Sequence, residues 1–399
     1  MTAVAVDAVA DAPAGKPPKR LRIAVLNRIF RPTGGGAERY SIALVEQLAA
    51  RHDIHVFAQQ IDHQWPGVTY HPIAWPFDKP RWMNQLWFAC ATWWQTRRGY
   101  DIVHSHENTW HGQMQTVHVV PVTYNLLQGR TGWTRALRWL KIVTSPRLLA
   151  YLGLEYFRYR PHPDRRIVLA SDSLRAVMDQ AFPRAANALR VVTPGVTRVA
   201  GVTGVAQKLA ARVKLGLPHG GRCVLFVGND YRKKGLDSLL RALTQLPTDC
   251  FLAVVGNAAQ IAGYRSELLA NGEQDRVFFL GALQTVEDAY CAADCLAHPT
   301  LEDTFAMVVL EAMAHGLPVV VSGTRYCGIS GLLVHETHAL ILKDPHDTAE
   351  LAMALQRLLA DEVLAGQLTE HGLRFANQHL WSKQALQQEQ LYYEVYAGR

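Results

Sequence analysis

The sequence predicts an α/β protein built from two doubly wound parallel sheets, Rossmann-like in layout, that face each other across a cleft. Three features of the 399-residue chain lead to this fold class: strand-like and helix-like segments alternate, the strand-like segments are almost continuously apolar, and the whole pattern runs twice. Apolar strands separated by helices are typical of parallel sheets that are covered on both faces. The chain is also long enough for two or three domains.

The first half of the chain supplies the first set of alternating segments. Residues 37–52, AERYSIALVEQLAARH, have apolar side chains at helical spacing and are expected to form an amphipathic helix. The strands expected here cover residues 21–27, 54–59, 101–106, 116–120, 166–171 and 189–195. These segments should build one complete sheet of the first domain.

The second half repeats this rhythm more regularly. Its expected strands cover residues 223–229, 250–256, 277–281, 295–300, 318–322 and 339–344, with helices near 235–246 and 261–271. Residues 197–222 between the two sets contain Gly and Pro and show little strand character, so the domain boundary should fall there. Ligands of doubly wound sheets bind outside the carboxyl ends of the strands, and the site is therefore expected in the cleft between the domains.

The amino-acid composition indicates a globular enzyme and argues against a membrane-spanning protein. The chain is 49% hydrophobic and 19% charged, as in an ordinary globular enzyme, and it has no apolar run long enough to span a membrane. An excess of 41 Lys and Arg over 34 Asp and Glu favours anionic partners such as phosphates or acidic lipid. The six scattered cysteines are expected to be reduced thiols of a cytoplasmic protein. Residues 1–20 are expected to form a disordered tail rather than a secretory signal.

A run of glycines separates the first strand from the first helix. Gly34, Gly35 and Gly36 would let the backbone approach an anion closely, and the helix behind them would supply free amide groups. Three consecutive cations, Arg232, Lys233 and Lys234, follow the first strand of the second domain and suit a diphosphate. The alternatives are a tight turn without a ligand and a solvated basic loop.

Three acids lie in or beside the segment HPTLEDTFAMVVLEAMAHGLPVVVSG, which is otherwise largely apolar. On a helix, Asp303 and Glu311 would differ by about 80° and share a side, whereas Glu302 and Glu311 would face opposite sides. We expect Asp303 in the loop after a strand, Glu311 on the following helix, and Glu302 exposed. Buried carboxylates suit the hydroxyl groups of a sugar or ribose. Alternatively, Asp303 is a structural acid that caps the helix.

Four histidines fall within residues 104–118, and they admit a metal site or a packed core. Strand alternation places His104 and His106 on one face, but no thiol or second pair of carboxylates accompanies them. Core packing is therefore the preferred interpretation for these two. The sequence also contains no D-x-D motif, which would hold a metal-bridged diphosphate. We expect no metal and no other cofactor.

These motifs together resemble a GT-B glycosyltransferase of family four, over residues 21–395. The glycine-rich turn, the basic residues before KG, and HP followed by DTFAMVVLEAMAHGLPVVVS carry the resemblance. Within the family, the chain is similar to bacterial lipopolysaccharide core glycosyltransferases of the glucosyltransferase I type. The resemblance implies an N-terminal acceptor-binding domain of residues 21–200 plus 380–399, to which the final helix returns. It implies a nucleotide-sugar-binding domain of residues 201–379.

The resemblance also implies roles for individual residues. Asp303 would bind hydroxyl groups of the donor sugar, where the family has Glu, and Glu311 would bind the ribose. Asn229 stands where the family has an arginine, so Lys233 or Arg232 would join Lys234 at the diphosphate, and we favour Lys233. The remaining donor contacts implied are the backbone amides of Thr304, Phe305 and Ala306, and either His111 or His118 near the sugar's 6-hydroxyl, with His118 preferred.

The reaction implied is the retaining transfer of a hexosyl group from a UDP-sugar, such as UDP-glucose, to a lipopolysaccharide core or related lipid-linked saccharide. The acceptor hydroxyl would attack on the face from which the diphosphate leaves, and no catalytic base is assigned. Two alternatives are a nucleotide-sugar epimerase of the same fold and a non-catalytic nucleotide-sugar-binding scaffold at the membrane. Intact Lys234 and Glu311 argue against the scaffold, whereas Asn229 and Asp303 keep it open.

Two segments of the first domain combine tryptophan with basic residues. Residues 81–100 and 132–160 contain Trp, Leu and Tyr beside Arg and Lys at helical spacing. This composition is typical of interfacial helices on anionic lipid, although such aromatic residues also form ordinary cores or dimer surfaces. No nucleic-acid-binding module accompanies them, so nucleic acid is not an expected partner. We expect a cytoplasmic protein held peripherally at the inner face of the plasma membrane.

Overall fold

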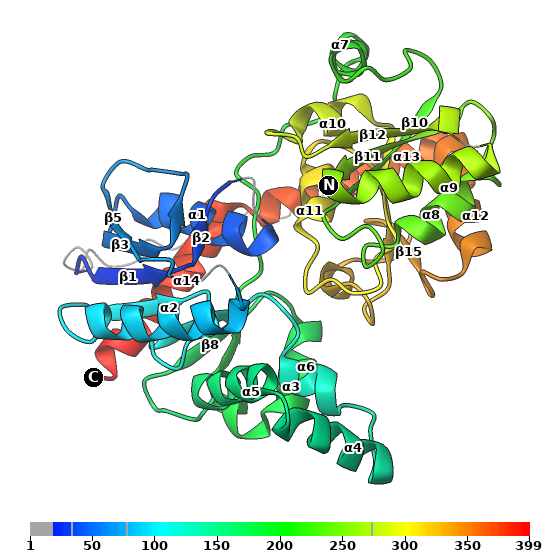
Figure 1. Ribbon diagram of the computed structural model, residues 1–399. Helices are drawn as coiled ribbons and strands as arrows, with labels where there is room; N and C mark the ends of the chain where they lie inside the picture. The colour runs from blue at the N-terminus through cyan, green and yellow to red at the C-terminus, as the bar shows by residue number, and fades with distance from the viewer. Residues whose placement is uncertain (1–18, 33–34, 77–78, 273) are drawn as a thin grey trace, which may run out of the picture.

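Two parallel sheets, each with its own helices, make up the molecule (Figure 1). The computed structural model describes residues 19–32, 35–76, 79–272 and 274–399. Most of the predicted N-terminal tail and Gly34 of the glycine run lie outside the described residues. The predicted fold class, two doubly wound parallel-sheet units, is confirmed.

The first sheet has seven strands, all parallel to their neighbours. In spatial order they are β5 (Val68–Pro72), β3 (Asp53–Ala58), β1 (Arg22–Leu26), β6 (Ile102–Ser105), β7 (Met114–Val117), β8 (Arg166–Leu169) and β9 (Leu189–Val191). A separate short ribbon pairs β2 (Ile29–Phe30) with β4 (Gln60–Ile61). The chain order reverses between β1 and β6, which makes their carboxyl ends the topological switch point of this sheet.

The second sheet has six parallel strands and the same kind of reversal, here between β10 and β13. In spatial order they are β12 (Val277–Gly281), β11 (Cys250–Gly256), β10 (Arg222–Gly228), β13 (Cys295–His298), β14 (Val319–Ser322) and β15 (Leu340–Leu342). Both sheets therefore offer a ligand site at the carboxyl ends of their central strands.

Packing on both faces explains why the central strands are continuously apolar. Side chains alternate between the two faces of a strand. In β10, Cys223, Leu225 and Val227 pack into the core on one face, and Val224 and Phe226 pack into the core on the other. Neither face of this strand meets water, so no polar alternation is needed.

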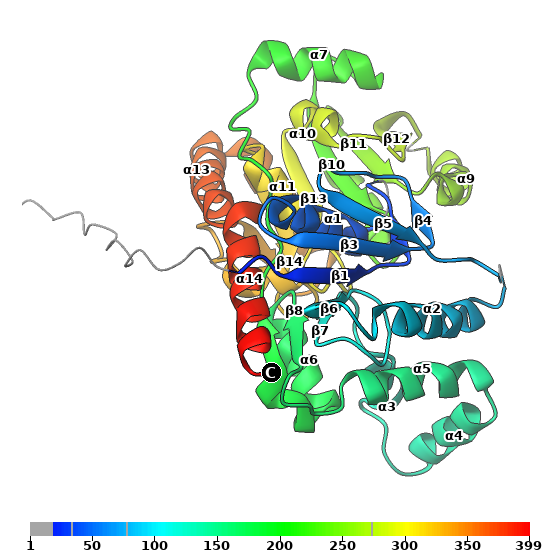
Figure 2. The ribbon, with the colours of Figure 1, turned by 90° about the vertical axis from the view of Figure 1, so that its left-hand side faces the viewer.

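Helices cover the faces of both sheets (Figures 1 and 2). Those that follow strands of the first sheet are α1 (Gly36–Leu48), α2 (Arg81–Thr96), α3 (Val122–Leu127), α4 (Gly132–Val143), α5 (Pro146–Arg158) and α6 (Asp172–Ala181). The second set is α7 (Val205–Leu215), α8 (Leu236–Leu243), α9 (Ile261–Asn271), α10 (Glu287–Ala292), α11 (Met307–Ala314), α12 (Thr348–Ala360) and α13 (Glu362–Gln378). Within the described ranges, no helix has both the length and the apolar character needed to cross a bilayer.

The last helix, α14 (Trp381–Ala397), returns to the first sheet and lies beside β1 in Figure 2. Trp381 and Tyr392 belong to the core that also holds residues of β1 and α1. The two crossings of the chain are bonded to each other, because the amide of Val196 donates to the carbonyl of His379 and the amide of Trp381 donates to Val196, both at 2.9 Å. The joint between the two halves is therefore a short double connection.

Gly195 is expected to be required at this joint. A Cβ atom there would lie 2.7 Å from the backbone nitrogen of Trp381 and 2.9 Å from the carbonyl oxygen of His379, and backbone atoms cannot rotate away. We expect Gly195→Ala to lower the free energy of unfolding by about 1–3 kcal/mol in urea titrations. Gly153→Ala on α5 is the control, since nothing lies within 4 Å of its Cβ position. Equal stability of the two variants would contradict this account.

Candidate active site

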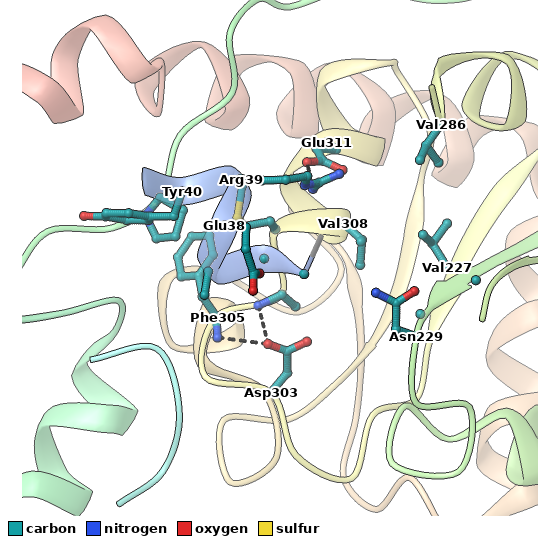
Figure 3. Close-up of a pocket in the computed structure, with 18 of the residues that line it drawn as sticks. Glu38, Arg39, Tyr40, Val227, Asn229, Val286, Asp303, Phe305, Val308 and Glu311 are labelled. Atoms are coloured by element: carbon teal, nitrogen blue, oxygen red, sulfur yellow. Dashed lines mark hydrogen bonds and ion pairs between the residues drawn. The ribbon is translucent and has the colours of Figure 1, made fainter. Parts of the chain in front are cut away.

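A cavity of about 940 Å³ lies where the carboxyl ends of the two sheets face each other. Loops that follow β7, β10 and β13 line it, together with the first turn of α1 and the start of α11 (Figure 3). The predicted site residues that line it are Gly35, Gly36, His118, Asn229, Lys233, Lys234, Asp303, Thr304, Phe305, Ala306 and Glu311. Topology thus brings together residues separated by more than two hundred positions in the sequence.

Two predicted site residues lie away from this cavity. The side chain of Arg232 is 85% exposed, reaches Asp237 at 3.6 Å, and lines a separate hollow beside α8 and α9. His111 does not line the cavity either, and both of its ring nitrogens are buried without a hydrogen-bond partner in the described structure. Burial, with a smaller contribution from Arg165, lowers the pKa of His111 to about 3. The structure thus places neither Arg232 nor His111 at this cavity, although both were predicted to contact the donor.

Asp303 uses both of its carboxylate oxygens. Oδ2 accepts from Lys234 Nζ at 2.5 Å and lies 3.3 Å from Nε2 of His298, while Oδ1 accepts from the amides of Phe305 and Ala306 at 3.2 and 2.8 Å (Figure 3). Burial by itself raises the pKa of Asp303, but the bond from His298 and the charge of Lys234 outweigh burial and lower that pKa well below its ordinary value. The carboxylate is therefore ionised and fixed in position.

These bonds change the expected role of two amide groups. The amides of Phe305 and Ala306 were expected to contact a ligand, yet Asp303 already accepts from both. Both amides precede α11, which begins at Met307, so Asp303 orders the loop before the helix rather than capping the first amides of the helix itself. Ala306 also has φ of +73°, a left-handed conformation that a residue with a Cβ rarely adopts. Such strained positions concentrate at functional sites, where the surrounding structure maintains them.

The two lysines after β10 both face acidic residues of the loop after β13. Lys234 bonds Asp303 and also donates to the carbonyl of Glu302 at 3.2 Å. Lys233 pairs with the carboxylate of Glu302 at 2.6 Å, and these two side chains are 45% and 41% exposed. Glu302 is partly exposed as expected, and its carboxylate has a cationic partner.

Glu311 connects the two halves of the molecule. On α11, it forms an ion pair with Arg39 of α1 through Oε1 (Figure 3). Its Oε2 accepts from the hydroxyl of Tyr290 at 2.8 Å. The negative charge of Glu311 raises the pKa of Arg39, and burial raises the pKa of Tyr290 well above its ordinary value. Arg39 is thus a permanent cation and Tyr290 a neutral donor.

Sequence reasoning missed Arg39, Tyr290 and His298 as site residues. A signal was present for two of them: Arg39 falls in the first helical turn after the glycine run, and His298 ends the strand that precedes Asp303. His298 lies at the carboxyl end of its strand and Arg39 at the start of the helix behind the glycine-rich loop, and both are places where site residues gather. No sequence motif marks Tyr290 as a site residue. It lies on α10, and the packing of this helix into the core brings it to the cavity.

Comparisons with known proteins agree with this architecture. Residues 34–198 match the family described as Glycosyltransferase Family 4, and residues 221–361 match Glycosyl transferases group 1. A relative, D-inositol 3-phosphate glycosyltransferase of Salinispora arenicola, is 31% identical over 322 residues, which cover 71% of this chain and 66% of the relative. The match therefore spans slightly less than two thirds of that protein.

Solved structures of low sequence identity share the fold. WaaG, a glycosyltransferase involved in lipopolysaccharide biosynthesis, superposes with a TM-score of 0.78 at 18% identity, covering 92% of this chain and 98% of WaaG. HepE of Anabaena, solved in complex with UDP-glucose, gives a TM-score of 0.72 at 18% identity, covering 95% of this chain and 100% of HepE. Glycosyltransferase family models match residues in both halves, and the solved structures share the fold over 92–95% of the chain. The chain is a glycosyltransferase with the GT-B fold.

This glycosyltransferase holds its charged groups in pairs around the cavity. Among the residues that the structure describes, no group of three or more His, Cys, Asp or Glu side chains is arranged to hold a metal ion. Four cationic side chains line the cavity: Arg39, Arg198, Lys233 and Lys234. The arrangement can bind a dianionic phosphate at the lysines and hydroxyl groups at the two acids.

The ion pair between Asp303 and Lys234 should make the stability of the glycosyltransferase depend on pH. The folded-state pKa of Asp303 lies below the 3.8 of an unpaired group, so its stabilisation is full well above pH 3.8 and is lost as the pH falls through the folded-state value. We expect Asp303→Asn to lower the free energy of unfolding by about 1–3 kcal/mol at neutral pH. The difference from wild type should shrink below about pH 5 in urea titrations.

Glu302→Gln is the matched control for this measurement. It removes an acid from the adjacent position, but its pair with Lys233 is largely solvated and should contribute less than about 1 kcal/mol. A larger loss of stability for Glu302→Gln than for Asp303→Asn at neutral pH would show that the ordering of these two pairs is wrong.

Proposed function

We propose that this glycosyltransferase transfers a hexosyl group from a nucleotide sugar, with UDP-glucose as the first donor to test, and retains the anomeric configuration. The observation that carries the proposal is the contact of Lys234 with Asp303 in the cavity between the sheets. It places a cation suited to diphosphate beside a fixed carboxylate suited to sugar hydroxyls. Donor binding is assigned to residues 201–379, and acceptor binding to residues 21–200 with 380–399.

In this proposal, the acids bind hydroxyl groups of the donor and the cations bind its diphosphate. Glu311 accepts from the ribose hydroxyls, which compete with Arg39 for Oε1 while Tyr290 keeps Oε2. Asp303 accepts from hydroxyls of the transferred sugar. Lys234 and Lys233 approach the diphosphate, with Asn229 beside them. The N–H groups of the first turn of α11 add donors, since they have no acceptor within the helix.

The chemistry follows from where charge develops. The acceptor hydroxyl attacks the anomeric carbon on the face that the diphosphate leaves, the bond from that carbon to the diphosphate oxygen breaks, and the departing diphosphate takes up the hydroxyl proton. Negative charge grows on the diphosphate during this step, so lysines fixed near it stabilise the transition state more than the ground state. No side chain is assigned as nucleophile, and no metal or other cofactor is invoked.

We propose a lipid-linked saccharide, such as a lipopolysaccharide core, as the acceptor, because α4 presents an apolar face that nothing in the described structure covers. Trp133, Leu137 and Leu140 are 77%, 52% and 60% exposed, and Ile142 is the buried residue of this helix. At 100° per residue, these three exposed side chains lie within about 60° of one another. Figures 1 and 2 both show α4 at the far end of the molecule from α7.

Basic side chains flank this apolar face and indicate which surface it would meet. Lys141 on α4, about 40° from Leu137 around the helix, and Arg147 at the start of α5 are exposed, whereas the exposed Arg135 lies on the opposite side of α4. An apolar helical face with flanking cations favours the interface of an anionic membrane. An enzyme bound to the membrane surface and an acceptor anchored in the same membrane diffuse in one plane, which favours their encounter. Membrane binding therefore supports a lipid-linked acceptor. The protein would then act as a peripheral membrane protein on the cytoplasmic side.

An inositol phosphate is the second candidate acceptor. The observation that favours it is the sequence relationship with D-inositol 3-phosphate glycosyltransferases. Labelled UDP-glucose incubated with a truncated lipopolysaccharide core, and separately with inositol 3-phosphate, distinguishes the two. Label on the core supports the first acceptor, and label on inositol phosphate replaces it with the second. Epimerised donor or binding without turnover would contradict transfer.

Substitution of the three acids should separate their roles. We expect Glu311→Ala to weaken donor binding about tenfold or more, since one lost bond to a charged group is worth about 1.5–3 kcal/mol. Asp303→Ala should chiefly lower kcat, and Glu302→Ala should change either constant little. Thermal stabilisation by UDP-glucose measures binding, and labelled transfer measures kcat. If Glu302→Ala proved the most damaging, the assignment of Asp303 and Glu311 as partners would be wrong.

The membrane proposal predicts a loss of vesicle binding. The triple variant Trp133→Ser, Leu137→Ser, Leu140→Ser should sediment less with phosphatidylcholine vesicles that contain phosphatidylglycerol than wild type does, because it removes most of the apolar face. Val205→Ser with Val213→Ser on α7 is the control, since these side chains are 88% and 58% exposed at the opposite end of the molecule. Equal losses in the two variants, or no binding by wild type, would overturn the proposed surface.

A further inference from the structure

His118 shares a hydrogen bond with a second buried histidine at the edge of the cavity. Nδ1 of His106 lies 3.0 Å from Nε2 of His118, and the ring planes differ by 14° with centroids 5.3 Å apart. The contact therefore runs through the facing nitrogens rather than the ring faces. Burial lowers the pKa of His118 to about 3 and the pKa of His106 well below its ordinary value. Both rings are neutral, so a single proton lies between the two nitrogens.

The other ring nitrogen of His106 decides which histidine supplies that proton. Nε2 of His106 is buried and has no hydrogen-bond partner in the part of the chain that the structure describes. If His118 were the donor, His106 would carry its own proton on Nε2, and a buried N–H without an acceptor costs about 1–3 kcal/mol. A proton on Nδ1 leaves only an unused lone pair at Nε2, which buried sites tolerate better than an orphaned N–H.

The surroundings of His106 keep its ring in this orientation. Its amide donates to the carbonyl of Leu26 on β1 at 3.0 Å. On one side, its ring lies 4.3 Å from the ring of His104, whose own nitrogens bond the hydroxyls of Tyr392 and Thr116 at 2.6 Å. His106 is thus a rigid donor, while His118 itself lines the cavity.

We propose that His106 is a positioning residue that fixes the tautomer of His118. His106 donates from Nδ1 to Nε2 of His118, so His118 carries its own proton on Nδ1, the nitrogen left for a ligand in the cavity. His118 then acts there as a hydrogen-bond donor to an oxygen of the bound sugar. The role toward sugar depends on the proposed function, whereas the tautomer itself does not.

The tautomer can be measured directly by nitrogen NMR of the full-length protein with ¹⁵N-labelled histidine rings. The resonances of His118 are assigned by their loss in His118→Gln. We expect His118 to be neutral and protonated on Nδ1 in wild type. In His106→Leu, which has no donor, this preference should disappear. In His106→Asn, the amide nitrogen occupies the position of Nδ1 and should restore it. Should the leucine variant unfold, His106→Gln replaces it, since its amide reaches the Nε2 position instead.

Kinetics and a control complete the test. With UDP-glucose as donor, kcat/KM should fall about tenfold in His106→Leu, the value of one hydrogen bond, and recover mostly in His106→Asn. His55→Leu is the matched control: it removes another buried histidine and its 2.8 Å bond to His71, away from the cavity, and should leave the His118 spectrum unchanged. A wild-type His118 protonated on Nε2, or an unchanged tautomer in His106→Leu, would overturn the proposal. If every protein lacked transferase activity, the proposed function would fail while the spectra still decided the tautomer.

Discussion

A buried charge needs a partner, and this requirement organises the cleft of the glycosyltransferase. Removing an ion from water costs several kcal/mol unless another charge and hydrogen bonds replace the lost solvation. Two acids at the cavity find such partners in different ways. Asp303 bonds Lys234 and two backbone amides, and Glu311 bonds Arg39 and Tyr290. The site is consequently preorganised, because its groups are fixed by bonds that exist within the protein.

Preorganisation depends on the two sheets. Each acid follows β13 and each lysine follows β10, neighbouring strands at the switch point of the second sheet, so their loops are adjacent by topology. The other face of the cleft comes from α1 and from the loop after β7, where His118 lies. The carbonyl of His118 accepts from the hydroxyl of Thr304 at 2.9 Å, and this contact keeps the two halves in register at the site.

The sequence predicted most of this fold because its signals were local. Continuous apolar runs marked the strands of the second sheet, and the ranges 250–256 and 277–281 agree with β11 and β12 residue for residue. The edge strand β5, VTYHP, was missed, since a partly exposed strand with a proline lacks an apolar run. Most of the residues predicted for the site line the one cavity between the sheets, because they follow strands. Arg232 and His111 do not line the cavity, and sequence spacing does not tell which way a side chain leaves a turn.

The pair between Arg39 and Glu311 crosses from one half of the molecule to the other, where the proposed function places the ribose of the donor. A ribose hydroxyl and the Arg39 guanidinium would compete for the same oxygen of Glu311. The affinity for the nucleotide is then coupled to the relative position of the two halves. Coupling between two equilibria is reciprocal. If nucleotide binding favours separation of the two halves by some factor, separation of the halves raises the affinity for the nucleotide by the same factor. Under the proposed function, donor binding and separation of the two halves are therefore coupled through this one contact.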